Sequence, residues 1–176
     1  VNEVLTIKPG FPEKWENASL EIPDISIDFS RKDKKDSYHI ENHFVAKMDL
    51  KLLLNAPFDG VESISVNGKN VSWKAIPESV GTPKISVEVP YNIVYDVVIN
   101  WKSGTFRKIY TKPSYNSGDA LNISITKGEM VSIYDPQGVL SQIDKKERTL
   151  QSIVNGEGNK TFFIQMKQGE LSWWYP

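Results

Sequence analysis

The two histidines, His39 and His43, and the acid between them, Glu41, are the first residues whose types suggest chemistry. On a helix, positions four apart lie on one face and could ligate one metal ion. The surrounding residues alternate between apolar and polar with a period of two, which indicates a strand instead. At about 3.3 Å per residue, the two histidines then lie about 13 Å apart, too far to ligate one zinc ion. We therefore interpret the three residues as an exposed polar face and predict no metal site.

Other catalytic arrangements lack the residues that they need. A Ser-His-Asp triad requires a histidine oriented by a buried acid, and the two histidines of this chain lie on the polar face. A glycosidase could work with two carboxylates alone, but no acidic residue stands in an apolar context that would raise its pKa. Residues 156–161 lack the spacing of a phosphate-binding loop and lead into a strand pattern. We predict no catalytic residue and no cofactor, and a free-standing enzyme ranks last among the functions considered.

Period-two alternation dominates the chain, and this pattern predicts an all-β fold. The stretch Tyr38–Leu54 is apolar at most even positions but is longer than a normal strand, so we expect a bend or bulge, most readily at Asn42. Asn67-Gly68 predicts a tight hairpin. Trp101 shares parity with the apolar residues before it and is predicted to lie in the core.

Strand spacing predicts an antiparallel β-sandwich over residues 1–112, followed by a smaller antiparallel β unit over residues 113–176. The turns of the second unit include Asp135-Pro136-Gln137-Gly138, which fits a type I turn. Because this unit has fewer than about 65 residues, we expect it to pack on the first unit or on a missing catalytic domain.

Composition excludes several classes of partner. The chain has 21 Lys+Arg and 22 Asp+Glu residues, without the basic stripe that binds nucleic acid. No apolar stretch reaches the about 20 residues of a membrane-spanning helix, and no cysteine supports a disulfide or a thiol nucleophile. The mixed charges of Arg31–Asp36 predict a solvated loop. Val1 begins within the pattern without a signal peptide, so we expect the chain to be processed or cut from a longer one.

The segment Leu5–Leu20 contains Pro9-Gly10-Phe11-Pro12 followed by Trp15. It resembles the segment that follows the catalytic (α/α)6 barrel in bacterial six-hairpin glycosidases and glycoside phosphorylases, where it opens a C-terminal β-sandwich. Two prolines and a glycine favour an extended turn, and a tryptophan supplies a large apolar anchor. The resemblance implies that Pro9, Phe11, Pro12 and Trp15 form a structural anchor. We expect Trp15 to be substantially buried, either on the sandwich or on the barrel.

The resemblance implies a function for the chain. It would be a non-catalytic accessory β-sandwich region of a secreted bacterial glycoside hydrolase, located outside the cell, in the periplasm or on the cell surface. Its partner would be the catalytic (α/α)6 domain of the same polypeptide, with carbohydrate as a second partner. The resemblance assigns no catalytic residue to this chain, because the catalytic acids of the family lie on the barrel. Two alternatives remain: a carbohydrate-binding module, which requires exposed aromatic residues, and an Ig-like cell-surface spacer or adhesion domain, which requires smooth polar faces.

The last hairpin carries the most specific prediction. With the turn at Gln168-Gly169, its apolar residues all lie on one face, with the pairs Met166–Leu171, Ile164–Trp173 and Phe162–Tyr175. The opposite face then pairs Phe163 with Trp174. Two large rings are not expected to remain in water for a cross-strand contact alone. We therefore predict that Phe163 and Trp174 contact the first sandwich, the catalytic domain or a sugar.

Overall fold

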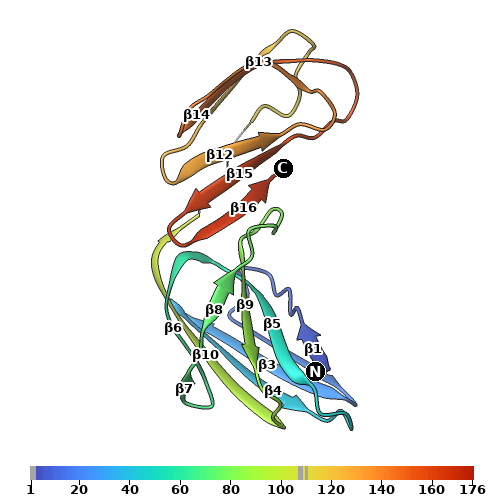
Figure 1. Ribbon diagram of the computed structural model, residues 1–176, viewed down its shortest axis with the longest axis vertical. Coiled ribbons are helices and arrows are strands. Elements are labelled where there is room, and N and C mark those ends of the chain that lie inside the picture. Colours follow the sequence, from blue (N-terminus) through green and yellow to red (C-terminus); the bar gives the residue numbers. More distant parts are fainter. Residues whose placement is uncertain (1–2, 107–108, 110) are drawn as a thin grey trace. The chain divides into compact units, whose positions relative to one another are not determined.

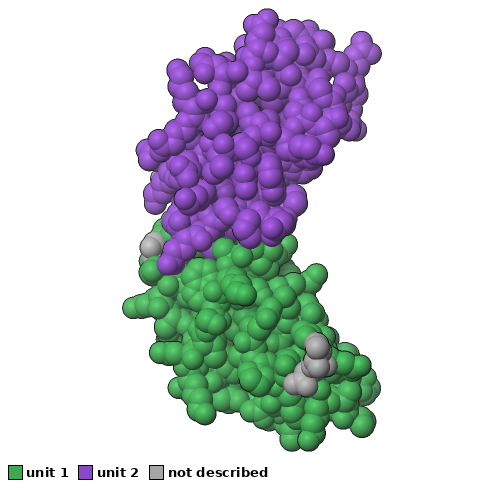
Figure 2. All heavy atoms as spheres, in the orientation of Figure 1, with its two compact units in different colours: residues 1–76, 84–105 green, residues 77–83, 106–176 purple. Residues whose placement is uncertain are grey.

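The computed structural model describes residues 3–106, 109 and 111–176. These residues form strands, turns and loops without a helix, so the predicted all-β fold is confirmed. None of them lies in a helix that could span a membrane. The chain divides into two compact units (Figures 1 and 2): unit 1 comprises residues 1–76 and 84–105, and unit 2 comprises residues 77–83 and 106–176. Unit 2 thus begins at Phe106 and includes a short inserted segment, whereas the sequence placed the division after residue 112.

Unit 1 contains two sheets that enclose a common core. The four-stranded sheet has the order β1(Val4–Ile7), β5(Asp49–Asn55), β9(Lys84–Val89) and β8(Trp73–Ala75). The six-stranded sheet has the order β2(Asn17–Ile22), β3(Ile25–Lys32), β4(Lys35–Asn42), β10(Val94–Thr105), β6(Phe58–Val66) and β7(Lys69–Asn70). β1 and β5 run parallel, and the other described pairs of unit 1 are antiparallel.

The core of unit 1 follows from the alternation of the sequence. Successive side chains of a strand point to opposite faces, so residues two apart share a face. Every second residue is buried in β5, in β3 from Ile25 to Phe29 and in β10 from Tyr95 to Trp101, and Trp101 is only 2% exposed. The core positions predicted for these strands are therefore confirmed, among them Ile25, Ile27, Phe29, Leu50, Leu52, Leu54, Tyr95, Val97 and Ile99.

The long alternating stretch Tyr38–Leu54 forms two strands in different sheets. β4 ends at Asn42, where we expected the break, and β5 begins at Asp49 in the opposite sheet. The stretch is therefore not one bent strand, and both halves keep their apolar residues at even positions because both face the same core. The hairpin at Asn67-Gly68 is confirmed: both residues have positive φ, 50° and 76°, as a type I′ turn requires.

The charged run Arg31–Asp36 is a hairpin: residues 32–35 at its tip are exposed as predicted, but its two end residues form a buried ion pair that the prediction of a solvated loop did not include. β3 and β4 are joined by the two residues Asp33-Lys34, and this register places Arg31 opposite Asp36. Arg31 Nε and Nη2 donate to the two carboxylate oxygens of Asp36 at 2.6 and 2.7 Å. Asp36 is fully buried, and its hydrogen bond raises the pKa of Arg31. Charge patterning could not detect this ion pair, because it depends on which charges face inward across the turn.

Unit 2 contains two three-stranded sheets. One has the order β11(Ala120–Ser124), β14(Thr149–Val154) and β13(Leu140–Lys145), and the other has the order β12(Glu129–Tyr134), β15(Phe163–Gln168) and β16(Leu171–Tyr175). Their facing side chains form a core of Leu121, Ile123, Met130, Val139, Leu140, Leu150, Ile164, Met166 and Trp173. A turn forms at Asp135–Gly138 as predicted, with Gly138 N donating to Asp135 O at 3.5 Å. The Asp135 carboxylate also accepts hydrogen bonds from the backbone of Val139 and Leu140 at 2.9 and 2.8 Å.

The segment 77–83 connects β8 to β9 along the chain but pairs with β16 inside unit 2. Trp174 N donates to Ser79 O and Gly81 N donates to Trp174 O, both at 2.8 Å. These bonds form a parallel bridge between Val80 and Trp174. They satisfy backbone groups of β16 that a free sheet edge would leave exposed.

Candidate functional site

The last hairpin has a different register from the one predicted. Its turn is Gly169-Glu170, and Ile164 faces Tyr175 while Met166 faces Trp173. Gly169 has a φ of 58° at the first central position, where a type II′ turn places its glycine. The shift is two residues, so every side chain keeps its predicted face. Burial of the apolar face could not exclude this register, because a strand repeats every two residues.

The predicted pair of Phe163 with Trp174 is therefore wrong. Phe163 pairs with Tyr134 of β12, and Trp174 lies opposite Gln165. The ring of Tyr134 lies 6.2 Å from that of Phe163 and 6.4 Å from that of Trp174, between ring centroids. These three residues are called the aromatic face below.

The aromatic face lies on the outer side of the β12–β15–β16 sheet. Phe163 and Trp174 are half-buried, and Tyr134 is 57% exposed. The sequence missed Tyr134 because the pairing of β12 with β15 joins residues about thirty apart in the chain. A contact of Phe163 and Trp174 with a sugar or a partner stays a prediction.

The anchor motif is fixed to unit 1 through Phe11. The ring of Phe11 lies 5.0 Å from that of Phe29, which belongs to the core, and 6.4 Å from that of Trp15. Trp15 N donates to Pro12 O at 3.0 Å, and Arg31 Nη1 donates to Glu13 O at 3.0 Å. The turn after Pro9 is thus held by contacts within the unit, with Pro9 itself half-buried and Pro12 exposed.

Trp15 is 51% exposed. The expectation that it is buried on the sandwich is therefore wrong, and burial on a catalytic barrel stays a prediction. Two residues of β2, the strand that follows Trp15, are similarly exposed: Leu20 at 45% and Ile22 at 46%, although they pair with the buried Ile27 and Ile25. β2 is an edge strand of the six-stranded sheet, so its core-side residues are only half covered. Trp15, Leu20 and Ile22 are called the apolar edge below.

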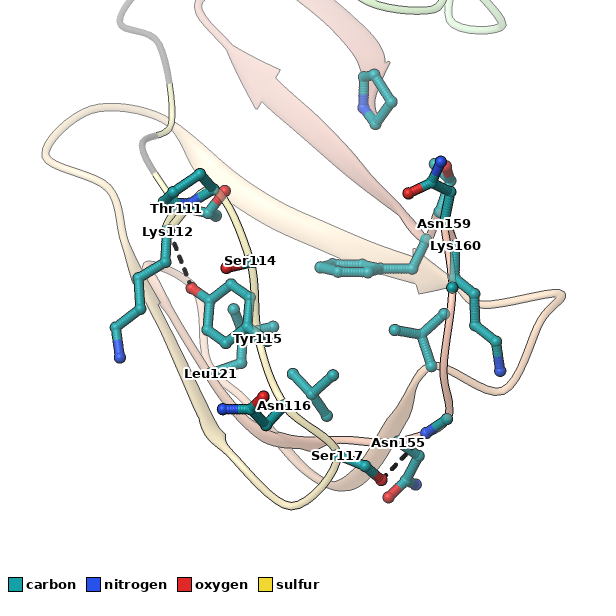
Figure 3. Close-up of a pocket in the computed structure, with 18 of the residues that line it drawn as sticks. Thr111, Lys112, Ser114, Tyr115, Asn116, Ser117, Leu121, Asn155, Asn159 and Lys160 are labelled. Carbon is teal, nitrogen blue, oxygen red and sulfur yellow. Dashed lines mark hydrogen bonds between the residues drawn. The ribbon is translucent and has the colours of Figure 1, made fainter.

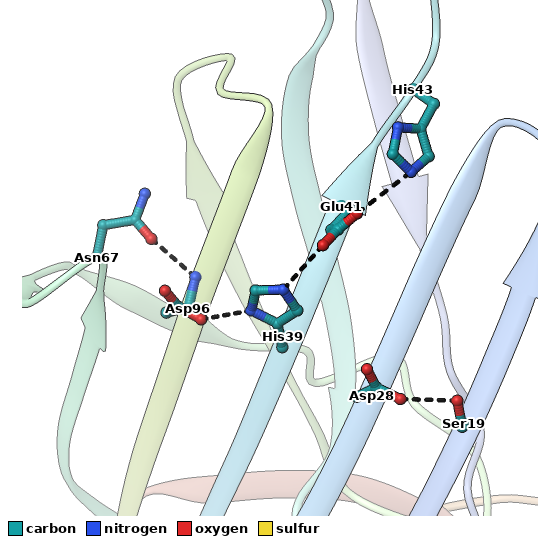
Figure 4. A network of polar contacts seen from close by, with 7 residues as sticks. All are labelled: Ser19, Asp28, His39, Glu41, His43, Asn67 and Asp96. Carbon is teal, nitrogen blue, oxygen red and sulfur yellow. Dashed lines mark hydrogen bonds and ion pairs between the residues drawn. The ribbon is translucent and has the colours of Figure 1, made fainter.

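A row of polar residues crosses the outer face of the six-stranded sheet (Figure 4). Strand pairing places Asp28, His39 and Asp96 side by side on β3, β4 and β10. His39 Nδ1 lies 2.6 Å from Asp96 Oδ1, and His39 Nε2 lies 3.3 Å from Glu41 Oε1. The other oxygen of Glu41 lies 3.5 Å from His43. The prediction that His39 and Glu41 lie on the exposed face of a strand is confirmed.

Both ring nitrogens of His39 thus face a carboxylate. The hydrogen bonds to Asp96 and then to Glu41 raise the pKa of His39. A histidine in this setting favours its protonated form and has no free nitrogen to accept a proton from a nucleophile. Among the described residues, no group of three or more His, Asp or Glu side chains has the arrangement to hold a metal ion. The sequence missed Asp28 and Asp96 because only strand pairing brings them beside His39.

Comparison of this chain with protein-family models, with curated proteins and with solved structures finds no match.

Proposed function

We propose that this chain is a non-catalytic accessory β-sandwich region of a secreted bacterial glycoside hydrolase, and that it supports an (α/α)6 catalytic domain. The observation that carries the proposal is the apolar edge: Trp15, Leu20 and Ile22 each leave about half of a large apolar side chain in water. This edge begins in the segment that resembles the exit from a glycosidase barrel. Exposed apolar residues gathered on one edge are typical of an interaction surface.

The motif is already held in one conformation before any partner binds. Phe11 packs on Phe29, and Arg31 fixes the Glu13 carbonyl. A partner therefore would not need to order this segment, and the free energy gained by covering Trp15 would go into association. Tryptophan is one of the residue types enriched among such anchors at protein interfaces.

The polar row supports a non-catalytic role. His39 lies at the centre of the row, and both of its ring nitrogens face carboxylates. Asp28 accepts a hydrogen bond from Ser19 at 2.7 Å. These contacts tie the side chains of neighbouring strands to one another, and His39 has no ring nitrogen free to act as a base toward a nucleophile.

Titration calorimetry of the chain with the (α/α)6 domain of a six-hairpin glycosidase tests the proposal. We expect binding that the double variant Trp15→Ser/Ile22→Ser weakens at least about tenfold. Ile93→Ser is the matched control, because Ile93 is 58% exposed in unit 1 but lies outside the apolar edge. Equal weakening by the control, or no binding at all, would contradict the docking role.

A screen of the chain alone against aryl-glycosides and polysaccharides tests the non-catalytic part. We expect no turnover. Reproducible hydrolysis that disappears on substitution of an acid in this chain would overturn it.

The aromatic face favours a second candidate, a carbohydrate-binding module. Its rings stand on one side of a sheet, where sugar rings could stack on Tyr134 and Trp174. Titration of neutral oligosaccharides with tryptophan fluorescence, with Trp174→Ala as the comparison, tests this candidate. The third candidate is an Ig-like spacer or adhesion domain, which requires smooth polar faces. The half-exposed Trp15 disfavours it, because it places a large apolar ring on the surface.

A further inference from the structure

Unit 2 contains an open cleft of about 800 Å³ (Figure 3). One wall is the segment 111–117, and the other is the segment 155–162. The two walls meet where Gly156 N donates to Ser117 Oγ at 3.3 Å. The cleft is within the size range of small-molecule sites in proteins.

The floor of the cleft is apolar and belongs to the core of the unit. Leu121, Ile123 and Ile164 are almost fully buried, yet they line the cleft. Tyr115 and Phe162, one from each wall segment, also line the cleft. The ring of Tyr115 is held in place because its hydroxyl accepts a hydrogen bond from Lys112 N at 3.2 Å. A ligand with a flat apolar face therefore meets aromatic surface on both sides.

The rim supplies amides. Asn116, Asn155 and Asn159 line the cleft, and within the described part of the chain their side chains have no hydrogen-bond partner. Each amide offers both donors and acceptors. This pattern matches a ligand with many hydroxyl groups better than it matches a hydrocarbon.

The charged residues at the rim do not favour an ionic ligand. Lys112 and Lys160 lie on opposite walls, and their ammonium groups point away from the space between the walls (Figure 3). The ammonium of Lys112 lies 5.7 Å from the ring centre of Tyr115. Glu157 also lines the cleft and would repel an anion.

We infer that this cleft binds a short neutral oligosaccharide. Sugar rings would pack against Tyr115 and Phe162, and their hydroxyls would bond to the amides of Asn116, Asn155 and Asn159. The choice of carbohydrate rests on the proposed function, but the site is separate from both the apolar edge and the aromatic face. Loss of the cleft would therefore leave the docking role of unit 1 intact.

The test is a titration of the 15N-labelled chain with cellotetraose, xylotetraose, mannotetraose and maltotetraose, followed by NMR. We expect at least one of them to give saturable shifts in the side-chain amides of Asn116, Asn155 and Asn159. Tetragalacturonate serves as the charged comparison. No saturable shift up to about 10 mM of any neutral sugar, or shifts with the charged sugar alone, would overturn the inference.

Adjacent phenylalanines provide the matched variants. Phe162 lines the cleft, whereas Phe163 belongs to the aromatic face on the other side of the sheet. We expect Phe162→Ala to weaken binding about tenfold or more and Phe163→Ala to leave it within about twofold. The reverse order would assign the sugar to the aromatic face and overturn the inference.

Phe162 is half-buried, so its variant could lose structure. Asn159 is exposed, so Asn159→Ala is not expected to disturb the fold. We expect this variant to weaken sugar binding about threefold or more. The amide spectrum of each variant checks that unit 2 stays folded. Unchanged affinity in Asn159→Ala and in a folded Phe162→Ala would also overturn the inference.

Discussion

The two units leave different parts of their apolar surface open to water. In unit 1, the central strands are covered on the core side, and three exposed apolar residues, those of the apolar edge, lie on and beside the edge strand β2. In unit 2, the cleft between the segments 111–117 and 155–162 is open to water, and core residues such as Leu121 line it. An uncovered sheet edge suits another protein, whereas a concave gap suits a small ligand. The comparison therefore separates the docking role proposed for unit 1 from the ligand-binding role proposed for unit 2.

The two tryptophans of unit 1 give the largest expected contrast. Trp101 is 2% exposed and Trp15 is 51% exposed. We expect Trp101→Ala to lower the free energy of unfolding of unit 1 by about 4 kcal/mol, as for other buried aromatics. Trp15→Ala should cost less than about 1.5 kcal/mol, because much of its ring is already in water.

Urea denaturation followed by NMR signals of each unit measures both variants. A cost for Trp15→Ala as large as that for Trp101→Ala would mean that the apolar edge serves the stability of unit 1 and is not reserved for a partner.

The buried ion pair of unit 1 ranks next. Asp36→Ala leaves the Arg31 guanidinium without its bidentate partner, and removal of one member of a buried pair costs roughly 3–5 kcal/mol. Because Arg31 keeps some access to water, at 16% side-chain exposure, we expect a loss near the lower end, about 3 kcal/mol. The same denaturation experiment measures it, with Asp28→Ala on the outer face as control. Equal losses for the two substitutions would contradict a special role for the buried pair.

Two leucines, one in the core of unit 2 and one on the apolar edge of unit 1, allow a further comparison of the units. Leu150 of β14 is fully buried, and Leu20 of β2 is 45% exposed. We expect Leu150→Ala to destabilise unit 2 by about 3 kcal/mol and Leu20→Ala to destabilise unit 1 by less than about 1 kcal/mol. Hydrogen exchange of backbone amides in each unit reports the two effects separately. A small cost at Leu150 would show that unit 2 repacks around the cleft.

The smallest expected effect concerns pH. The hydrogen bonds to Asp96 and Glu41 raise the pKa of His39 in the folded chain. Their contribution to stability is therefore complete below the ordinary histidine pKa of about 6.5 and is lost as the pH rises through the raised pKa. Exposure of the side chain keeps the effect small.

Thermal melting at about pH 5.5 and about pH 8.5 measures this effect against the variant His39→Gln. We expect the native chain to melt at a higher temperature than His39→Gln at the lower pH, and this difference in melting temperature to shrink at the higher pH. His43→Gln is the control, and an advantage that grows with pH would contradict the raised pKa.

Local patterns predicted much of the fold. The alternation of apolar residues identified the core faces of β3, β5 and β10, because neighbouring side chains on a strand point in opposite directions. Turn chemistry identified the hairpin at Asn67-Gly68 and the turn at Asp135, because each depends on a few adjacent residues. None of these features requires knowledge of which strands pair.

Pairing between distant strands decided the rest. Asp96 reaches His39 only because β10 lies beside β4, and Tyr134 reaches Phe163 only because β12 lies beside β15. The two-residue shift in the last hairpin preserved every buried face, so the periodic pattern could not distinguish it from the predicted register. The cleft likewise exists only where two loops and a core floor come together. By itself the sequence determined which side of each strand is apolar, and the tertiary structure decided which of those sides remain open, because coverage depends on neighbours that are remote along the chain.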